Sequence, residues 1–549
     1  MDKTLEIYVS VLKTYLSYCF ANQQNINPVE LNRERFRTKA VFIAAIFFLK
    51  NGKRSNVSII LGTNDWFKQF FAADNLFSSI IDAANPYLHE LIDHQLSNLI
   101  SIEDIDVPTL YETLLSIETG NENTRTEIST AKNYRNKLGS YYTPSELAKA
   151  VTEKTINAFF ELNYGIKKGV FSAHPQLGEV DVTAIKFADF SCGGGNFLVE
   201  IIHYFKQKLT SFNLEDREKS AILTAIALNI SAFDVDCLAL EVAKINMLLL
   251  IGQPRLYSDF KDNFVHANFL LQTNFVIDEA TKRAVFSDGF IYHEQLALHK
   301  SKLVRYDIVL GNPPWEKIRF EEKKFYALYS TTIANNHFKS SRTNEINATE
   351  QNHVQLATFS EQFKIEIEKA KFDLKRNPFF SLSNNGELNT YALFTEAALK
   401  LKTPKGVVGL VLKSAIVTSQ VNQKLFQYLT KKHLVVAIYD FINRKKLFNI
   451  DSRERFCFLL LGNNPNNHFE VSMNLTTVEE LSKSTPLSNL SYEALKLLNP
   501  FTGMLPNVST KEEIDFLLRI SAHFPFFKTV FDKVRFGRIV HFTSHAFFL

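Results

Sequence analysis

Apolar runs of strand length recur through the middle of the chain, and stretches with helical spacing of apolar positions lie between them. The runs are short and nearly continuous, which is typical of buried parallel strands. The predicted strands cover residues 184–189, 230–236, 306–310 and 406–414. The intervening stretches 197–229 and 391–401 are predicted to be helical. This pattern indicates an α/β fold.

The flanking and inserted segments have other patterns. Residues 1–135 are predicted to form a mostly helical domain, because VFIAAIFFLK and LFSSIIDAANPYLHELIDHQLSNLI carry apolar residues at helical spacing. Residues 316–390 are polar and contain the charged helical run Phe359–Arg376, which marks them as an insertion. Residues 466–549 are less regular than the segment before them.

The composition limits which classes of protein this chain can belong to. The 549 residues are 46% hydrophobic and 22% charged, and the net charge of +4 permits nucleic-acid binding without requiring it. The four cysteines are far apart and form neither a CxxC pair nor a disulfide framework. The longest apolar run, residues 40–49, is too short to span a bilayer. We therefore expect a cytoplasmic protein with no membrane partner.

The most informative stretch is Asn312–Pro313–Pro314–Trp315, directly after a predicted strand. Two prolines fix φ and remove two backbone donors, so the Pro313 carbonyl is held on a stiff loop. Open α/β sheets bind ligands at this end of their strands. Asn312 adds a side-chain acceptor and Trp315 adds a flat apolar face. Two acceptors beside a stacking surface suit a planar ring with an exocyclic amino group; a proline turn against a core tryptophan is the alternative.

Residues 184–198 predict a strand, a glycine-rich turn and a helix. Gly193 and Gly195 allow the backbone to approach a ligand closely, and the helix start beyond them can receive a carboxylate or phosphate. Asp189 ends the strand and can accept a hydrogen bond from an amine. Because the turn lacks Gly-Lys-Ser/Thr, it is not a P-loop.

Asp234 ends the next predicted strand, where an acidic residue can bind both hydroxyls of a ribose. It lies 45 positions after Asp189, whereas the acid of a dinucleotide-binding fingerprint follows by roughly 20. This spacing disfavours an NAD site. A solvent-exposed carboxylate at a strand end is the alternative.

Upstream, Gly139–Ser140–Tyr141–Tyr142–Thr143–Pro144 predicts the entry to a helix. Thr143 is expected to cap the helix, with Pro144 at its first position and Glu146 completing a capping box. Tyr141 and Tyr142 would then lie just before the helix start.

These stretches resemble motifs of one enzyme family. Asn312–Trp315 resembles the catalytic motif of amino-methyltransferases that use S-adenosylmethionine (SAM), above all the N6-adenine DNA methyltransferases. Residues 139–144 are similar to the Gly-x-Tyr-Tyr-Thr-Pro motif of type I and type IIG restriction-modification methyltransferases, and residues 189–195 to the SAM-binding loop. Residues 439–461 resemble that family's Asp-Phe-x-Asn…Phe-x-Ile-Asp-Ser-Arg-x-x-Phe segment. The order of the motifs is that of the gamma class.

The resemblance implies a site. Asn312 and the Pro313 carbonyl would accept from the target amine, and Trp315 and Phe456 would stack on the base. Asn268 stands where the family usually has Asp, and its amide oxygen can make the same contact uncharged. The residues implied to hold SAM are Tyr141, Tyr142, Thr143, Pro144, Asp189, Ser191, Gly193, Gly195, Asn196, Phe197, Asp234, Asn268 and Phe269. The implied in-line methyl transfer needs no metal.

The resemblance also implies a fold and a division of the chain. The fold is a Rossmann-like, seven-stranded class I SAM-methyltransferase core within residues 136–465. A DNA target-recognition region would begin at 466 and be incomplete within this chain. The implied partners are double-stranded DNA and a cognate restriction endonuclease or specificity subunit.

The implied activity is methylation of a flipped adenine, in restriction-modification or a related phage-defence system. Two alternatives remain open. The tetrapeptide also serves methyltransferases that act on protein glutamine or on RNA. A non-catalytic SAM- or DNA-binding subunit is the second alternative, suggested by Asn268 and the short C-terminal region.

Overall fold

The computed structural model describes most of the chain from residue 143 onward and shorter segments before it. The longer described ranges are 86–96, 117–122, 125–130, 143–166, 180–253, 263–272, 305–327, 338–352, 354–483, 488–506 and 510–524. Tyr141 and Tyr142 lie outside the described residues, as do residues 525–549 of the expected recognition region.

A nine-stranded mixed sheet forms the centre of the fold. Its strands, in order across the sheet, are β11 (Ser488–Ser491), β10 (His468–Leu475), β8 (Val435–Ile442), β9 (Arg455–Leu461), β7 (Lys402–Lys413), β6 (Tyr306–Gly311), β3 (Phe187–Asp189), β4 (Ile230–Asp234) and β5 (Phe264–His266). The strands predicted from the apolar runs are present. The α/β fold class expected from the sequence is confirmed.

Strand direction decides where the loops meet. Strands β7, β6, β3, β4 and β5 are parallel, and β9 lies antiparallel between β7 and β8, so β8 points the same way as β7. The seven strands from β5 to β8 correspond to the expected core. Strands β10 and β11 come from the segment in which we expected a recognition region to begin, and they extend the sheet beyond β8. They pair with an edge of β8 that would otherwise be open.

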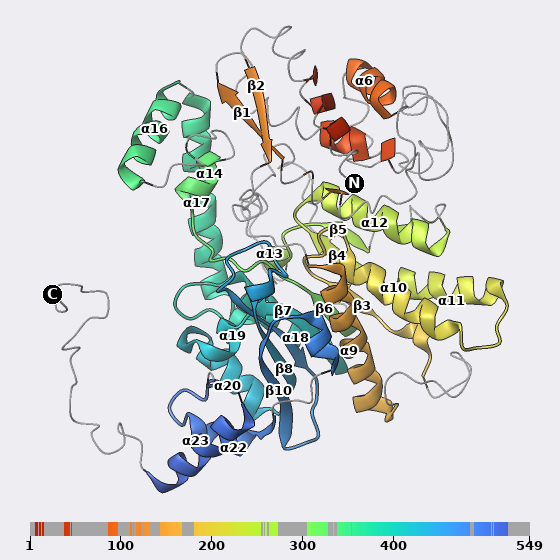
Figure 1. Ribbon diagram of the computed structural model, residues 1–549, viewed down its shortest axis with the longest axis vertical. Coiled ribbons are helices and arrows are strands. Elements are labelled where there is room, and N and C mark those ends of the chain that lie inside the picture. Colours follow the sequence, from red (N-terminus) through yellow and green to blue (C-terminus); the bar gives the residue numbers. More distant parts are fainter. Residues whose placement is uncertain are drawn as a thin grey trace.

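Helices cover both faces of the sheet (Figure 1). Figure 1 shows α10, α11 and α12 to one side of the sheet and α19 and α20 to the other, with α9 and α18 overlapping the sheet in this view. Their bounds are α9 (Ser145–Tyr164), α10 (Asn196–Leu209), α11 (Asp216–Leu228), α12 (Cys237–Ile251), α18 (Thr390–Leu401), α19 (Ala415–Thr418) and α20 (Gln423–Lys431). The stretch 197–229, predicted as helical, is therefore two helices. Short and C-terminal helices are α13 (Phe269–Gln272), α21 (Val478–Lys483), α22 (Tyr492–Leu498) and α23 (Lys511–His523).

Helix α9 packs unusually close to β7. A Cβ atom added at Gly409 of β7 would lie 2.0 Å from Thr155 Oγ1 of α9. Thr155 is fully buried and its hydroxyl already donates to Val151 O at 2.7 Å, so it cannot make room. Glycine at 409 therefore lets α9 lie against the sheet, with its first turn beside the end of β6.

The insertion folds around a small core of its own. It consists of α14 (Glu322–Ala327), α16 (Lys339–Asn352) and α17 (Val354–Arg376), and Figure 1 shows them projecting from one end of the sheet. Phe325, Tyr326, Ile333, Ile346 and Leu356 form a buried cluster separate from the main core. The predicted charged helix is confirmed as the larger part of α17.

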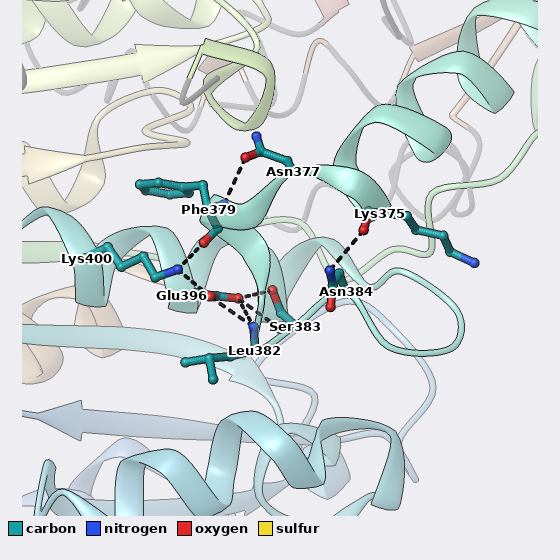
Figure 2. Close-up of polar contacts among 8 residues, drawn as sticks. All are labelled: Lys375, Asn377, Phe379, Leu382, Ser383, Asn384, Glu396 and Lys400. Carbon is teal, nitrogen blue, oxygen red and sulfur yellow. Dashed lines mark hydrogen bonds and ion pairs between the residues drawn. The ribbon is translucent and has the colours of Figure 1, made fainter. Parts of the chain in front are cut away.

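A buried carboxylate ties the return of the insertion to α18 (Figure 2). Glu396, whose side chain is fully buried, accepts from Ser383 N at 2.8 Å, Ser383 Oγ at 2.7 Å and Leu382 N at 3.0 Å. Lys400 forms an ion pair with it at 2.8 Å and also donates to Phe379 O. Since each acceptor is matched by a donor, the burial cost of the charge is offset. The start of α18 is thereby fixed.

The N-terminal segment is not only helical. Helix α6 (Pro86–Leu96) lies within a stretch predicted to be helical, but β1 (Ile117–Glu122) and β2 (Arg125–Thr130) form an antiparallel hairpin. Their sequences, IETGNE and RTEIST, carry one apolar residue each, so apolar periodicity could not reveal them. Within the described parts of the chain, no helix is both long enough and apolar enough to cross a membrane.

Candidate active site

The polar residues predicted from separate motifs lie along one edge of the sheet. Because β3, β4, β5 and β6 are parallel neighbours, their carboxyl ends meet there. Asp189 ends β3, Asp234 ends β4, Asn268 follows β5 and Asn312 follows β6. The structure thus brings four of the predicted site residues to a common edge.

The glycine-rich loop after β3 passes through the left-handed region, which favours glycine, at two positions. Gly193 and Gly195 have φ of +51° and +86°. A Cβ at Gly195 would also lie 2.7 Å from Ala243 Cβ of α12. Gly195 is the N-cap of α10, and Asn196 and Phe197 are its first two residues. The loop therefore turns tightly and exposes the start of α10 toward the same edge.

Asp234 braces this loop from the neighbouring strand. Its Oδ2 accepts from Gly193 N at 2.8 Å, and its Oδ1 accepts from Asp236 N at 2.8 Å. Asp236 in turn caps α12, accepting from Leu238 N at 2.9 Å. Burial, and then the charge of Asp236, raises the pKa of Asp234 to about 6 even though these N–H groups lower it. A residue predicted only as a ribose acceptor therefore also fixes the glycine loop.

Asp189 is a buried carboxylate with one oxygen unused. The residue is 1% exposed, and its Oδ1 accepts from Ser191 N at 3.0 Å. Its Oδ2 is buried and has no hydrogen-bond partner among the described residues. A Cβ at Gly311 would lie 2.8 Å from Asp189 Oδ1, so β6 can pass this carboxylate only with glycine there. Burial, and to a lesser degree Asp234, raises the pKa of Asp189 to about 8, while the Ser191 N–H lowers it.

Thr143 links the helix entry to both other motifs. Its hydroxyl accepts from Asn312 Nδ2 at 3.0 Å, and its carbonyl accepts from Asn196 Nδ2 at 2.8 Å. The predicted helix cap is therefore wrong. Helix α9 begins at Ser145, Pro144 is its N-cap, and no side chain caps it. The Thr143 hydroxyl is used in tertiary structure, across 169 residues of sequence, instead of in a local cap.

Trp315 belongs to an aromatic cluster. Its ring centroid lies 5.8 Å from that of Phe456, and the two rings are inclined by 22°. The Phe448 ring meets Trp315 edge to face, with ring centroids 5.1 Å apart. Phe456 is fully buried and stacks on Phe441 at 4.9 Å. A base held between two rings needs about 7 Å, two contacts of about 3.5 Å each. The structure thus brings Trp315 and Phe456 together, but in this arrangement no base fits between them.

Phe269 and Asn268 follow β5 as the motif predicts. Phe269 stacks on Phe190 with ring centroids 3.9 Å apart and meets Phe233 edge to face at 4.9 Å. It is 5% exposed, so its ring packs mainly against protein. Asn268 is partly exposed at the sheet edge.

Thr390 is a site residue that sequence reasoning missed. Its hydroxyl bonds to Pro314 O and accepts from Glu316 N at 3.1 Å, while its own N–H donates to Glu316 O at 2.9 Å. Thr390 is the first residue of α18, the helix fixed by Glu396. It therefore clamps the chain directly after the two prolines. A threonine at a helix start carries no signal that could have revealed this contact.

If the glycine loop holds SAM, as its motif implies, Gly195→Ala should weaken SAM binding about 5- to 150-fold, because a positive φ and a Cβ overlap together cost about 1–3 kcal/mol. Isothermal titration with SAM measures the change. Gly252→Ala is the matched control, since Gly252 has φ +66° but no atom near a Cβ. Equal SAM affinity in the two variants would contradict the proposed use of the loop.

The raised pKa of Asp189 predicts a pH-dependent stability. A carboxyl whose folded pKa lies above its unfolded value stabilises the protein below about pH 4, and this stabilisation is lost as the pH rises through about 8. We therefore expect Asp189→Asn, which does not ionise, to gain in thermal unfolding midpoint relative to wild type between pH 4.5 and pH 8, without ligand. A constant difference across this range would show that Asp189 ionises normally. If Asp189 holds the amino-acid part of SAM, as its motif implies, the same variant should also bind SAM more weakly, because the uncharged amide cannot form an ion pair with the ammonium group of SAM.

Comparison with known proteins gives one family match. Residues 366–448 match the family model described as Eco57I restriction-modification methylase. No curated protein is similar enough to count as a relative.

Solved structures to which this chain is similar include restriction-modification enzymes. A nuclease-deletion mutant of the type ISP enzyme LlaGI, in complex with a DNA substrate mimic, has 14% identity and a TM-score of 0.45, covering 88% of this chain and 36% of that one. The type IIG endonuclease BpuSI has 14% identity and a TM-score of 0.40, covering 92% and 45%. The type I methyltransferase subunit from Streptococcus thermophilus has 13% identity and a TM-score of 0.37, covering 88% and 73%. This chain spans less than half the length of the LlaGI and BpuSI chains.

The matched segment runs from the second half of α17 through α18, β7, α20 and β8 to Phe448. It includes Thr390, Glu396 and Asn443, which hold the loops around Trp315. The similarity of this chain to the Eco57I restriction-modification methylase family is therefore carried by residues 366–448.

Proposed function

We propose that this chain is a cytoplasmic, site-specific DNA methyltransferase that transfers the methyl group of SAM to adenine N6. The observation that carries the proposal is the junction of Asn312 with Thr143. It joins the Asn-Pro-Pro-Trp loop to the helix entry and, through Asn196, to the glycine-rich loop. Motifs for the target amine and for the cofactor thus meet in one hydrogen-bonded unit.

The residues at the sheet edge fit SAM. Asp189 offers a buried carboxylate oxygen with no hydrogen-bond partner among the described residues, suited to an ammonium group. The positive φ of Gly195 and its close approach to Ala243 of α12 hold the glycine loop in a tight turn at the start of α10. Asp189 would hold the amino-acid part, Asp234 the ribose, and Asn268 the adenine of SAM. Bound SAM supplies an electrophilic methyl group.

Asn312 and Pro313 would orient the target amine. The bond from Asn312 Nδ2 to Thr143 fixes the orientation of the amide, and Oδ1 is the side-chain atom that would accept from the substrate. Together with the Pro313 carbonyl, it would accept the two amino hydrogens and turn the nitrogen lone pair out of conjugation with the ring. Thr390 holds the next carbonyl, that of Pro314, and keeps the loop in place. Rate enhancement would come from positioning.

The adenine must leave the duplex to reach this loop, at a cost of a few kcal/mol. Stacking on Trp315 would return about 1–3 kcal/mol. Trp315 is 6% exposed, so its ring must be uncovered before a base can stack on it. We propose Phe456 as part of the wall behind Trp315 and not as a second stacking face, because it is fully buried.

The proposed biological role is DNA modification within a restriction-modification or related phage-defence system, with a cognate endonuclease or specificity subunit as partner. Residues 136–465 would form the methyltransferase domain, and residues beyond 466 would begin target recognition. The helical insertion would contribute to DNA contacts near the site.

The test is a transfer assay with methyl-labelled SAM and mixed-sequence duplex DNA, followed by digestion to nucleosides. Label in N6-methyladenine supports the proposal, and the modified positions give the recognition sequence. Label in N4-methylcytosine would show that the target base is cytosine and not adenine. Label in RNA or protein, with none in DNA, would overturn the proposal.

A further inference from the structure

The loop after β8 is held by one buried amide. Asn443 is fully buried, and its Nδ2 donates to Phe448 O at 2.9 Å and to Asp451 O at 3.2 Å. Its Oδ1 accepts from Phe448 N at 3.0 Å, and its own N–H donates to Glu454 O at 3.0 Å. A single side chain therefore ties the two ends of the loop together and fixes its shape.

This rigid loop presents three consecutive cations. Arg444, Lys445 and Lys446 are exposed, and Lys446 adopts a left-handed φ of +53° that turns the chain. Within the described residues, none of the three has a carboxylate at ion-pair distance. Because the backbone is fixed, three positive charges are held at neighbouring positions of this loop.

Nearby charges leave most of this positive charge uncompensated. The exposed Arg453 is paired with Asp451 at 2.7 Å. The pKa of Glu480 lies below its usual value, chiefly because Thr476 N donates to it and least because of Lys445. Glu480 is thus held mainly by the Thr476 backbone, and Arg444, Lys445 and Lys446 form no ion pair within the described structure.

The loop after β8 lies at the same edge of the sheet as the candidate active site. Strand β8 points the same way as β6, so its carboxyl end lies at the edge where Asn312 follows β6. Phe448, in the middle of the same loop, packs edge to face on Trp315 at 5.1 Å between ring centroids. The cations are therefore held in fixed relation to the stacking residue.

We propose that Arg444, Lys445 and Lys446 bind backbone phosphates of the DNA beside the target adenine. This inference rests on the proposed function. Phosphate contacts set the register of a protein on DNA without reading sequence, and they require fixed cations of this kind. Because Phe448 of this loop contacts Trp315, binding of the DNA backbone by the three cations would align the flipped base with the Asn312–Trp315 loop.

The chain offers a matched control for testing this loop. Lys431 ends α20 and Lys432 follows it; both are exposed and precede β8 at its amino end, on the opposite edge of the sheet. The double variants Lys445→Gln/Lys446→Gln and Lys431→Gln/Lys432→Gln remove the same charge from the two ends of one strand.

DNA binding by the full chain is measured by fluorescence anisotropy at several salt concentrations, with a non-reactive SAM analogue. Each lost phosphate contact should reduce the slope of log affinity against log salt by about 0.9. For Lys445→Gln/Lys446→Gln, we expect the affinity lost between 50 and 200 mM salt to be roughly tenfold smaller than for wild type. Its KM for DNA should rise while kcat at saturating DNA and SAM affinity stay unchanged. The control pair should match wild type.

Equal salt slopes for the two double variants would overturn the inference and leave the proposed reaction intact. If the salt slopes of the two double variants differ but the wild-type chain methylates no DNA, phosphate binding by the loop is supported and the proposed reaction is overturned. If the wild-type chain binds no DNA at low salt, both are overturned.

Discussion

Asn312→Ala is expected to lower the rate of methyl transfer to DNA about 100- to 1000-fold while leaving SAM affinity within a few-fold of wild type. Removing one preorganised polar contact to a reacting group typically has an effect of this size. Asn312 bonds to Thr143 and lies beyond the end of β6, whereas the proposed SAM contacts come from Asp189, Asp234 and the glycine loop. The measurement is single-turnover transfer of labelled methyl groups, with SAM binding measured in parallel.

Asn385→Ala is the control for this experiment, because Asn385 is an exposed asparagine in a surface turn. It should leave transfer unchanged. Retained turnover in Asn312→Ala would refute the assignment of Asn312 to the reaction. If SAM binding is lost as well, the bond from Asn312 to Thr143 serves the cofactor site instead of the target amine.

Trp315→Ala is expected to reduce kcat/KM for DNA about 5- to 150-fold, the equivalent of the 1–3 kcal/mol that base stacking contributes. Trp315→Phe keeps a stacking ring and should retain most of the activity. Alanine also leaves a space beside Phe448 and Phe456, so the thermal unfolding midpoint should fall as well.

The folding effect and the stacking effect can be separated by SAM binding, which should survive in Trp315→Ala at temperatures below its unfolding. Duplex DNA with 2-aminopurine at the target reports base extrusion directly. Wild-type kcat/KM in Trp315→Ala would contradict a stacking role.

The strands and the loops at their carboxyl ends could be predicted from sequence, because buried parallel strands are short, nearly continuous apolar runs. Residues 306–310 and 406–413 illustrate this, and both are strands in the structure. The hairpin β1–β2 escaped prediction, because its stability does not depend on a run of apolar residues in its own sequence. The cap assigned to Thr143 was wrong for a related reason: a local motif was compatible with the sequence, but a distant asparagine uses the hydroxyl.

Sequence alone determined which residue types stand at the ends of the strands. They are an aspartate at the end of β3, another at the end of β4, and an asparagine followed by two prolines after β6. Those positions follow from chain order. Only the tertiary structure decided how they are held. Thr390 on the Pro314 carbonyl and Asn443 beneath the basic loop act through contacts between segments, which local pattern cannot encode. The burial that raises the pKa of Asp189 likewise exists only once the neighbouring strands exclude water.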